Sequence, residues 1–477
     1  MKNNKLYLIA ALALSLSSCS KELDKININP NVTENAQPDY ILTGAIKNTV
    51  DMYWGTTNNM NSSLLFTQQF AKVQYTEEER FIYSGNSFTS LWSTGYTQGV
   101  SAFNTLIKLG DAAGNPNYRG VGLVLRSWVF LLLTDAYGDV PYSQAGQLKQ
   151  FVTPVYDKQK DVYFSLLDDL KAAGAVLDPA GKAIGGDVIY NGNILRWKKL
   201  ANSLRLRIAL RISDREPGKA KQIIDEIQAG NNLLLSEKAD IAQLIYQNSP
   251  QQNPISAQFE TREDYRVSKT IIDKLTELND PRLAIYANKT QNPSAAGYVG
   301  LPNGLDNDGA NAIGLANVSR PGAYFLQPLA PAVIFSYSEL LFDRAEAAAR
   351  GFTTENAAAL YQQAIRASFA QYGIADDAAT AYLAQPAVQY DATNFKKSIG
   401  EQKWLALYGQ GLEAWAERRR LDYPVLKASV KTVLDGQIPV RFIYPGTEQS
   451  LNGNSYKNAV ASQGPDLLTT KLWFDVN

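Results

Sequence analysis

Three consecutive glutamates, Glu77, Glu78 and Glu79, stand beside Arg80 and could in principle do acid chemistry. Glycoside hydrolysis needs two carboxyl groups that flank the scissile bond at a set separation. Consecutive side chains point in different directions, however, and a run of charge is typical of a solvated surface. The glutamate run nevertheless motivates an alternative hypothesis for this chain, an exported helical glycoside hydrolase or lyase that uses paired carboxylates.

The sequence contains no histidine, which removes the usual general base and the His-containing catalytic triads and zinc motifs. Nucleotide-binding fingerprints and the GxSxG nucleophile motif are also missing. Residues 306–309 (DNDG) resemble part of a calcium loop, but Gly304 and Leu315 occupy positions that need carboxylates, so we expect a turn. No catalytic residue, metal site or cofactor is predicted.

A long apolar stretch predicts the central helix of the fold, against which the helices that carry any site would pack. Nearly every side chain from Val121 to Leu133 is apolar, which predicts a helix buried on all sides and ending near Gly138. Arg126 and the short length argue against a membrane span. Further helices are predicted over residues 38–54, 61–72, 88–109, 194–213, 334–350, 354–372 and 395–420.

The connecting segments are also predicted from composition. Residues 334–350 and 354–372 should form a helical hairpin, with Thr354 capping the second helix. Residues 292–327 are rich in glycine, asparagine and proline and are expected to form a long loop, whereas residues 438–444 suggest a short strand or extended segment. Four tryptophans in apolar helical patterns are assigned to the core: Trp128, Trp197, Trp404 and Trp415.

Charge gives no reason to expect nucleic acid as a partner, because 46 basic residues balance 46 acidic ones. The basic stripe along residues 194–213, which includes Arg205, Arg207 and Arg211, is interpreted as a solvated or salt-bridged helix face.

The N-terminus has the layout of an export signal. Lys2 and Lys5 precede an apolar run over residues 6–16, and the only cysteine, Cys19, follows two serines. This pattern resembles a bacterial lipobox, in which cleavage precedes the cysteine and acyl chains on it anchor the protein. We expect residues 1–18 to be a lipoprotein signal peptide, with a plain signal peptide or an uncleaved anchor as alternatives.

Several motifs, taken in order, resemble the SusD/RagB family of outer-membrane nutrient-binding lipoproteins, in its SusD-like branch. No single motif is diagnostic, but their order spans nearly the whole chain. Besides Cys19, they are Asn29-Pro30-Asn31, 137–142 (YGDVPY), 279–283 (NDPRL), 300–304 (GLPNG), 339–351 (ELLFDRAEAAARG), 402–405 (QKWL), 413–420 (EAWAERRR), 438–442 (IPVRF), Tyr444-Pro445 and Leu472-Trp473.

The resemblance implies a mostly α-helical domain over residues 19–477, built on tetratricopeptide-like helix pairs with long inserted loops and a few short strands. It implies a lipid-anchored protein on the cell surface that binds an oligosaccharide, or in some relatives a peptide. It also implies a partner, a SusC-like TonB-dependent outer-membrane transporter that receives the ligand. No catalysis is implied. A helical-repeat adaptor with only protein partners remains a third possibility.

Sugar recognition needs aromatic faces that stack on a pyranose ring and planar polar groups that bond its hydroxyls. Aromatic residues on loops or helix ends are the natural candidates, although Trp92 and Tyr96 also fit a buried helix face. The candidate ligand-binding residues are Trp54, Tyr75, Arg80, Tyr83, Trp92, Tyr96, Asn104 and Tyr298.

Overall fold

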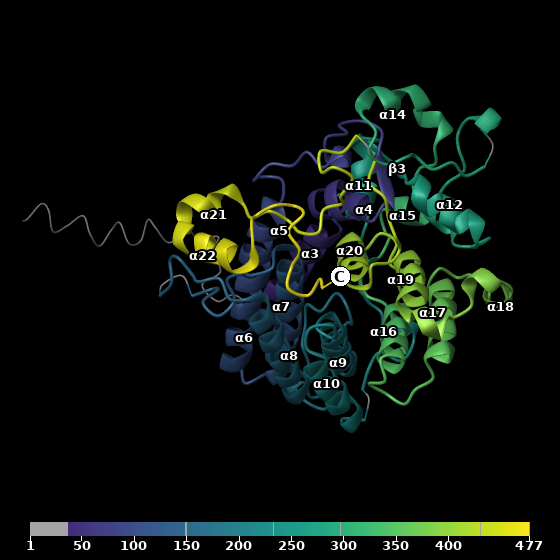
Figure 1. The fold of residues 1–477 in the computed structure, drawn as a ribbon. Helices are drawn as coiled ribbons and strands as arrows, with labels where there is room; N and C mark the ends of the chain where they lie inside the picture. Colours follow the sequence, from purple (N-terminus) through teal and green to yellow (C-terminus); the bar gives the residue numbers. More distant parts are fainter. Residues whose placement is uncertain (1–36, 148–149, 232, 296, 430, 477) are drawn as a thin grey trace, which may run out of the picture.

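The computed structural model describes residues 37–476 except 148–149, 232, 296 and 430 (Figure 1). Residues 1–18 and Cys19, the predicted signal peptide and lipidation site, lie outside the described residues, and both remain predictions. Helices dominate the described part, which confirms the mostly α-helical fold class.

The described part of the N-terminal third, which begins at residue 37, contains six α-helices, two π-helical segments, a 3₁₀ turn and a strand. In chain order they are α3 (Pro38–Trp54), η1 (Thr56–Ser63), α4 (Leu64–Phe66), β1 (Phe70–Lys72), η2 (Glu78–Arg80), α5 (Thr89–Thr94), η3 (Gly95–Val100), α6 (Ser101–Ala112), α7 (Pro116–Tyr137) and α8 (Gln159–Val176). The prediction of one helix over residues 61–72 is wrong, because the helix ends at Phe66 and a strand follows.

The middle of the chain alternates helices with short strands and 3₁₀ turns. The elements are α9 (Ile194–Arg211), α10 (Pro217–Ala229), η4 (Lys238–Asp240), β2 (Ala242–Leu244), α11 (Pro254–Thr261), β3 (Tyr265–Val267), α12 (Lys269–Glu277), α13 (Leu283–Tyr286), η5 (Pro293–Ala295), α14 (Asn307–Ile313), η6 (Leu315–Asn317) and α15 (Ala323–Leu326). The described residues of the expected loop over residues 292–327 therefore include two short α-helices and two 3₁₀ turns.

The C-terminal part begins with a strand and continues in helices. Its elements are β4 (Ala332–Phe335), α16 (Tyr337–Ala349), α17 (Ala357–Gln371), α18 (Asp376–Leu383), η7 (Pro386–Val388), η8 (Ala392–Asn394), α19 (Phe395–Ala406), α20 (Gly411–Leu421), α21 (Gly446–Leu451) and α22 (Gly453–Gln463). The helix predicted over residues 395–420 is two helices, because the chain turns at Gly409, whose φ of 86° suits glycine.

The predicted central helix is confirmed as α7. Asn115 caps its first turn by accepting a hydrogen bond from the Asn117 amide, and Gly138 ends it with a φ of 87°. The helix is long and apolar enough to cross a membrane, but its side chains are buried by the rest of the fold. A core position surrounded by other helices therefore accounts for its composition.

Helices that follow one another along the chain pack as pairs around this core. α7 lies against α6 and α8, α8 against α9, and α16 against α17 (Figure 1). The predicted hairpin is thus confirmed, but Asn356 caps α17 by accepting from the Ala359 amide, so the assignment of the cap to Thr354 is wrong. The four tryptophans assigned to the core are all buried.

Two small antiparallel sheets tie distant segments together. β1 pairs with β3, with Phe70 opposite Val267, and β2 pairs with β4 through an irregular register near Ala242. Residues 438–444 form no strand; they run beside α7, and the Phe442 amide donates to the Ala136 carbonyl.

A buried ion-pair cluster joins α7, α9, α16, α19 and α20. Arg211 bonds Glu417 at 2.5 Å and Glu413 at 2.6 Å, and Lys403 bridges to Glu417 at 2.7 Å. No member is more than 5% exposed. The cluster consists of Asp135, Arg207, Arg211, Glu339, Asp343, Glu346, Lys403, Glu413, Glu417 and Arg420.

Candidate functional site

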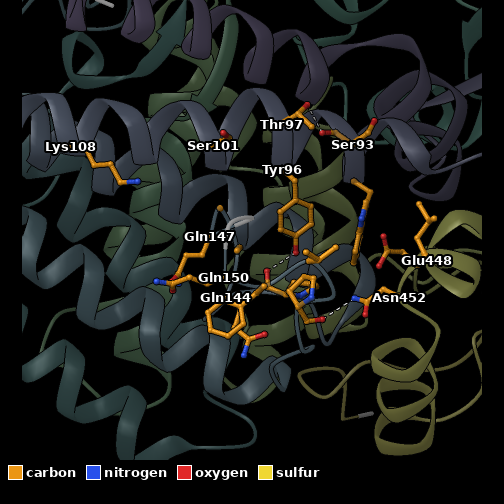
Figure 2. A pocket seen from close by; sticks show the side chains of 18 residues that line it. Ser93, Tyr96, Thr97, Ser101, Lys108, Gln144, Gln147, Gln150, Glu448 and Asn452 are labelled. Carbon is orange, nitrogen blue, oxygen red and sulfur yellow. Dashed lines mark hydrogen bonds between the residues drawn. The ribbon is translucent and has the colours of Figure 1, made fainter. Parts of the chain in front are cut away.

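A groove of about 800 Å³ runs between α5, η3 and α6 on one side and the loop after α7 on the other, with α21 closing one end (Figure 2). Its volume lies within the range of small-molecule sites in proteins. The residues that line it are Trp92, Ser93, Tyr96, Thr97, Ser101, Lys108, Pro141, Gln144, Ala145, Gly146, Gln147, Gln150, Phe151, Val152, Pro154, Glu448, Leu451 and Asn452.

Trp92, on α5, supplies an aromatic wall held in one orientation by other rings. Its indole packs edge-on against Tyr137 at 5.1 Å and Tyr444 at 5.7 Å between ring centroids, and it lies beside Tyr156 at 5.7 Å. The side chain is only 8% exposed. A ring fixed in this way loses little conformational entropy when a ligand covers its accessible part.

Tyr96 stands next to Trp92, with 5.1 Å between their ring centroids. It lies on η3, where the wider π-helical turn shifts the side-chain positions relative to an α-helix. The Tyr96 hydroxyl donates to the Pro141 carbonyl at 2.7 Å, which ties the ring to the loop opposite. Burial raises the pKa of Tyr96, so the phenol stays neutral.

Amide side chains form much of the polar wall, and several of them fix the loop after α7. The Gln144 carbonyl oxygen accepts from the Val155 amide at 2.9 Å, and the Asn452 amide donates to the Pro154 carbonyl at 2.8 Å. Each planar amide has a second polar atom that can bond a ligand. The wall can therefore exchange hydrogen bonds with hydroxyl or acetamido groups without burying a charge.

A smaller hollow of about 300 Å³ adjoins the groove and shares Lys108, Ala145, Gly146 and Gln147 with it. The predicted residue Asn104 lines this hollow. Its side-chain oxygen accepts from Arg126 at 2.8 Å, and Arg126 also pairs with Asp169 at 2.7 Å. The structure thus places three predicted residues, Trp92, Tyr96 and Asn104, along one continuous surface.

Three other predicted residues lie around η2. Tyr75 is 57% exposed, has a φ of 52°, and carries the Arg262 guanidinium 4.4 Å from its ring centroid. Arg80 lies 3.8 Å from Glu77 in an ion pair, and the Tyr83 hydroxyl donates to the Asn61 carbonyl at 2.6 Å. This second surface offers an exposed aromatic platform, but none of the three lines the groove.

The remaining two predicted residues lie apart from the groove. Trp54 is 2% exposed, and its indole nitrogen donates to the Val333 carbonyl at 3.0 Å, which makes it a core residue in this structure. Tyr298 is half-buried and packs against the core.

The glutamate run does not form a pair of facing acids. Glu78 pairs with Lys72 at 2.8 Å, and Glu79 is buried, where it accepts from the Gly304 amide at 2.6 Å and the Lys72 amide at 3.1 Å. The interpretation as solvated surface is therefore wrong for Glu79. Burial raises its pKa to about 7 despite those hydrogen bonds.

The calcium-like segment is a helix N-terminus. Asp306 caps α14 by accepting from the Gly309 amide at 2.9 Å, so the expected turn is the first turn of a helix. Across the described residues, no group of three or more Cys, Asp or Glu side chains is arranged to hold a metal ion.

The sequence did not predict the groove residues on the loop after α7 or those on and just after α21. The missed residues include Gln144, Gln147, Gln150, Glu448 and Asn452, which Figure 2 shows around Tyr96. They come from two segments about 300 residues apart, joined by the Asn452 bond to Pro154. The polar loop directly after the YGDVPY motif was the only local signal, because such loops often carry binding residues.

The comparisons with known proteins agree with this architecture. The family model described as SusD-like, starch-binding and associating with the outer membrane, matches residues 30–445. A chitin-binding protein of known structure is 31% identical, with a TM-score of 0.83, and the match covers 92% of this chain and all of that one. No curated protein matches the chain.

Two further solved structures extend the likeness. A SusD homologue from Bacteroides uniformis is 27% identical with a TM-score of 0.81, and the match covers 92% of this chain and all of the homologue. A chitin-binding SusD homologue from Flavobacterium johnsoniae is 24% identical with a TM-score of 0.82 over 92% of this chain and 99% of its own, and it supports the fold alone.

Proposed function

The chain belongs to the SusD-like family of nutrient-binding proteins that associate with the outer membrane, and from this premise we propose that it captures an oligosaccharide in the groove between α5 and α21. Members of the family are binding proteins without catalysis, so the expectation that the chain is not an enzyme is confirmed. The alternative of a glycoside hydrolase or lyase is thereby excluded.

The observation that carries the proposal is the fixed pair of aromatic rings beside a wall of neutral amides. Trp92 and Tyr96 are held by neighbouring rings and by the bond to Pro141, so their orientation does not depend on a ligand. Aromatic faces match the apolar side of a sugar ring, and amides match its hydroxyl groups. The Tyr75 platform has an aromatic ring too, but it is exposed and lacks an enclosing wall.

The ligand we propose is an oligosaccharide of N-acetylglucosamine. The 31% identical relative is a chitin-binding protein, and the amide side chains of Gln144, Gln147 and Asn452 can pair with acetamido groups as both donors and acceptors. A cavity of about 800 Å³ holds a few sugar units at most, so a longer chain would extend past the open sides.

Delivery is the second half of the proposed function. The lipobox-like sequence at Cys19 would tether the protein to the outer membrane by acyl chains, with the fold exposed at the cell surface. Family membership supports a SusC-like TonB-dependent transporter as the partner that receives the ligand. A Cys19→Ala variant in which a cleavable secretory signal replaces residues 1–18 should be released from membranes, whereas retention of that variant would contradict lipid anchoring.

Isothermal titration calorimetry of a soluble form that begins after Cys19 tests the binding step. Chito-oligosaccharides should bind without being cleaved, and cello-oligosaccharides of equal length, which lack the acetamido groups, should bind more weakly. Equal affinity for the two series would contradict the proposed role of the amide wall. Cleavage of either ligand would contradict a binding function.

The transporter step has its own test. Affinity purification of the full-length lipoprotein from solubilised outer membranes should recover a large β-barrel protein in stoichiometric amount. The Cys19 variant should recover less of it, because the tether no longer raises the effective concentration of the partner. Recovery of the lipoprotein alone from mildly solubilised membranes would argue against the delivery step.

A further inference from the structure

Two of the described residues that line the groove are charged, and they stand at opposite ends of it. Figure 2 shows Lys108 at the left and Glu448 at the right, with Tyr96 between them. Every other described residue that lines the groove is uncharged. The groove is therefore polarised along its length, positive on α6 and negative on α21.

Glu448 is the more specifically placed of the two. It is half-buried, and one oxygen of its carboxylate accepts from the Tyr156 hydroxyl at 2.5 Å. Within the described part of the chain it forms no ion pair with a lysine or arginine, whereas the other carboxylates of comparable or greater burial mentioned above either pair with a cation or accept several amide hydrogen bonds. Its second carboxylate oxygen remains able to accept a bond from a ligand.

The surroundings of Glu448 suit a cation. Tyr156 and Trp92 lie side by side with 5.7 Å between ring centroids, and Tyr444 lies 5.3 Å from Tyr156. Aromatic rings beside a carboxylate attract an ammonium group through both the ring quadrupole and the negative charge. A carboxylate also accepts hydrogen bonds from the hydroxyl groups of a neutral sugar, but an ammonium group gains an ion pair in addition.

We propose that the Glu448 end of the groove is a subsite for a protonated amine, and that the protein takes amino-sugar oligosaccharides carrying at least one unacetylated glucosamine unit. The proposal rests on the glycan-binding function proposed above and narrows its ligand class. Glu448 accepts the ammonium hydrogen bond, and Lys108 repels an ammonium at the other end. The two charges together fix the direction in which such a chain lies.

Two oligosaccharides of equal length test this proposal, one fully N-acetylated and one with a single unacetylated glucosamine unit at one end, in buffer in which the sugar amine carries its proton. The second chain keeps all its other acetamido groups, so we expect calorimetry of the wild-type protein to give about fivefold tighter binding of the chain with the free amine. Added salt should reduce this preference, because the ion pair is partly exposed to solvent.

Glu448→Gln is the decisive variant, because glutamine keeps the shape and can still accept from the Tyr156 hydroxyl. It should lose the preference for the amine, and an unchanged circular dichroism spectrum and melting temperature would show that the variant is folded. Lys108→Met is the matched control; it removes the other charge and should retain or increase the preference for the amine.

Three results would overturn the proposal: equal affinity of the wild-type protein for the two chains, a preference that survives in Glu448→Gln, or Glu448-dependent binding of a lysine-rich peptide with no binding of the amino sugar. If neither oligosaccharide binds to the wild-type protein, the glycan-binding function itself fails. A failure of the subsite alone is distinguishable, because the acetylated chain would still bind.

Discussion

The buried ion-pair cluster and the groove both contain polar side chains, but of different kinds. The cluster brings together charged groups such as Arg211, Lys403 and Glu417, none more than 5% exposed. The described lining of the groove has amides and hydroxyls along its wall, with Lys108 near one end and Glu448 near the other. Charge is thus concentrated where helices meet and kept sparse where a ligand is expected to enter.

The difference reflects the different tasks of the two regions: the cluster joins helices, whereas the groove exchanges water for a ligand. The ion pairs of the cluster link five helices, and burial raises the pKa of Glu339 to about 8 although Arg207 lies beside it. Burial alone would raise the pKa of Glu417, but Arg420 and Lys403 hold it well below its usual range. A ligand site must instead lose and regain water at every binding event, which costs far less for an amide than for an ion.

Breaking the cluster should have the largest effect. Arg211→Met leaves Glu413, Glu417 and Asp135 without a shared cation and should lower the free energy of unfolding by about 3–5 kcal/mol. Urea unfolding measures the loss. Lys221→Met is the control, because its pair with Asp225 is half-exposed and its loss should change stability by about 0.5 kcal/mol or less. A similar loss of stability in the two variants would mean that the buried cluster stabilises the fold no more than an exposed ion pair does.

Glu79 sharpens the comparison, because it is buried outside the cluster and burial raises its pKa to about 7. Between the ordinary glutamate pKa and 7 the folded state holds a proton that the unfolded state has lost, so stability falls as pH rises through this window. Glu79→Gln should remove this dependence. Its free energy of unfolding, relative to that of the wild type, should therefore rise by about 2–3 kcal/mol as the pH is raised from 5 to 8. If the free energies of unfolding of the two proteins changed in parallel with pH, the raised pKa of Glu79 would be ruled out.

The fold was largely predictable because its strongest signals are local. The apolar run at the centre of α7, its Gly138 terminus and the paired motifs of α16 and α17 each specify an element without reference to the rest of the chain. The errors lie where tertiary contacts override local pattern. Residues 70–72 form a strand only because residues 265–267 pair with them.

The charge pattern of α9 shows the same limit. Its arginines were predicted to lie on a solvated or salt-bridged face, and the salt-bridged part is confirmed for Arg207 and Arg211. Neither side chain is solvated, because both are buried and pair with carboxylates on α7, α16 and α20, which are distant in the sequence. A single sequence does not reveal such partners, because aspartate and glutamate are exposed in most proteins and nothing in their local sequence marks these ones as buried.

The site was predictable only in part, for a related reason. Trp92, Tyr96 and Asn104 belong to one helical stretch of the chain, which keeps them close to one another. Glu448 and Asn452 join them through the return of the chain after residue 444, which no local pattern marks. Trp54, by contrast, has a loop-facing position in the sequence but donates its indole hydrogen bond inside the core.

Removing the aromatic wall should have an intermediate effect on binding. Tyr96→Ala deletes a ring fixed by Trp92 and by the bond to Pro141, and it should weaken binding of a chito-oligosaccharide by about 1–2 kcal/mol. Tyr96→Phe keeps the ring and should bind nearly as well. We expect Tyr75→Ala to cost less than Tyr96→Ala, and the reverse order would move the site to the Tyr75 platform.

The smallest effect is expected from removing charge from the groove when the ligand is neutral. Lys108→Met should change the affinity for a fully acetylated chito-oligosaccharide by about 0.5 kcal/mol or less, because Lys108 is exposed and its charge is screened by water and salt. Calorimetry at low and high salt measures the change, with Tyr40→Ala, an exposed tyrosine outside the groove, as the control. A loss as large as that of Tyr96→Ala would mean that the groove recognises its neutral ligand through charge, and the contrast with the buried cluster would no longer hold.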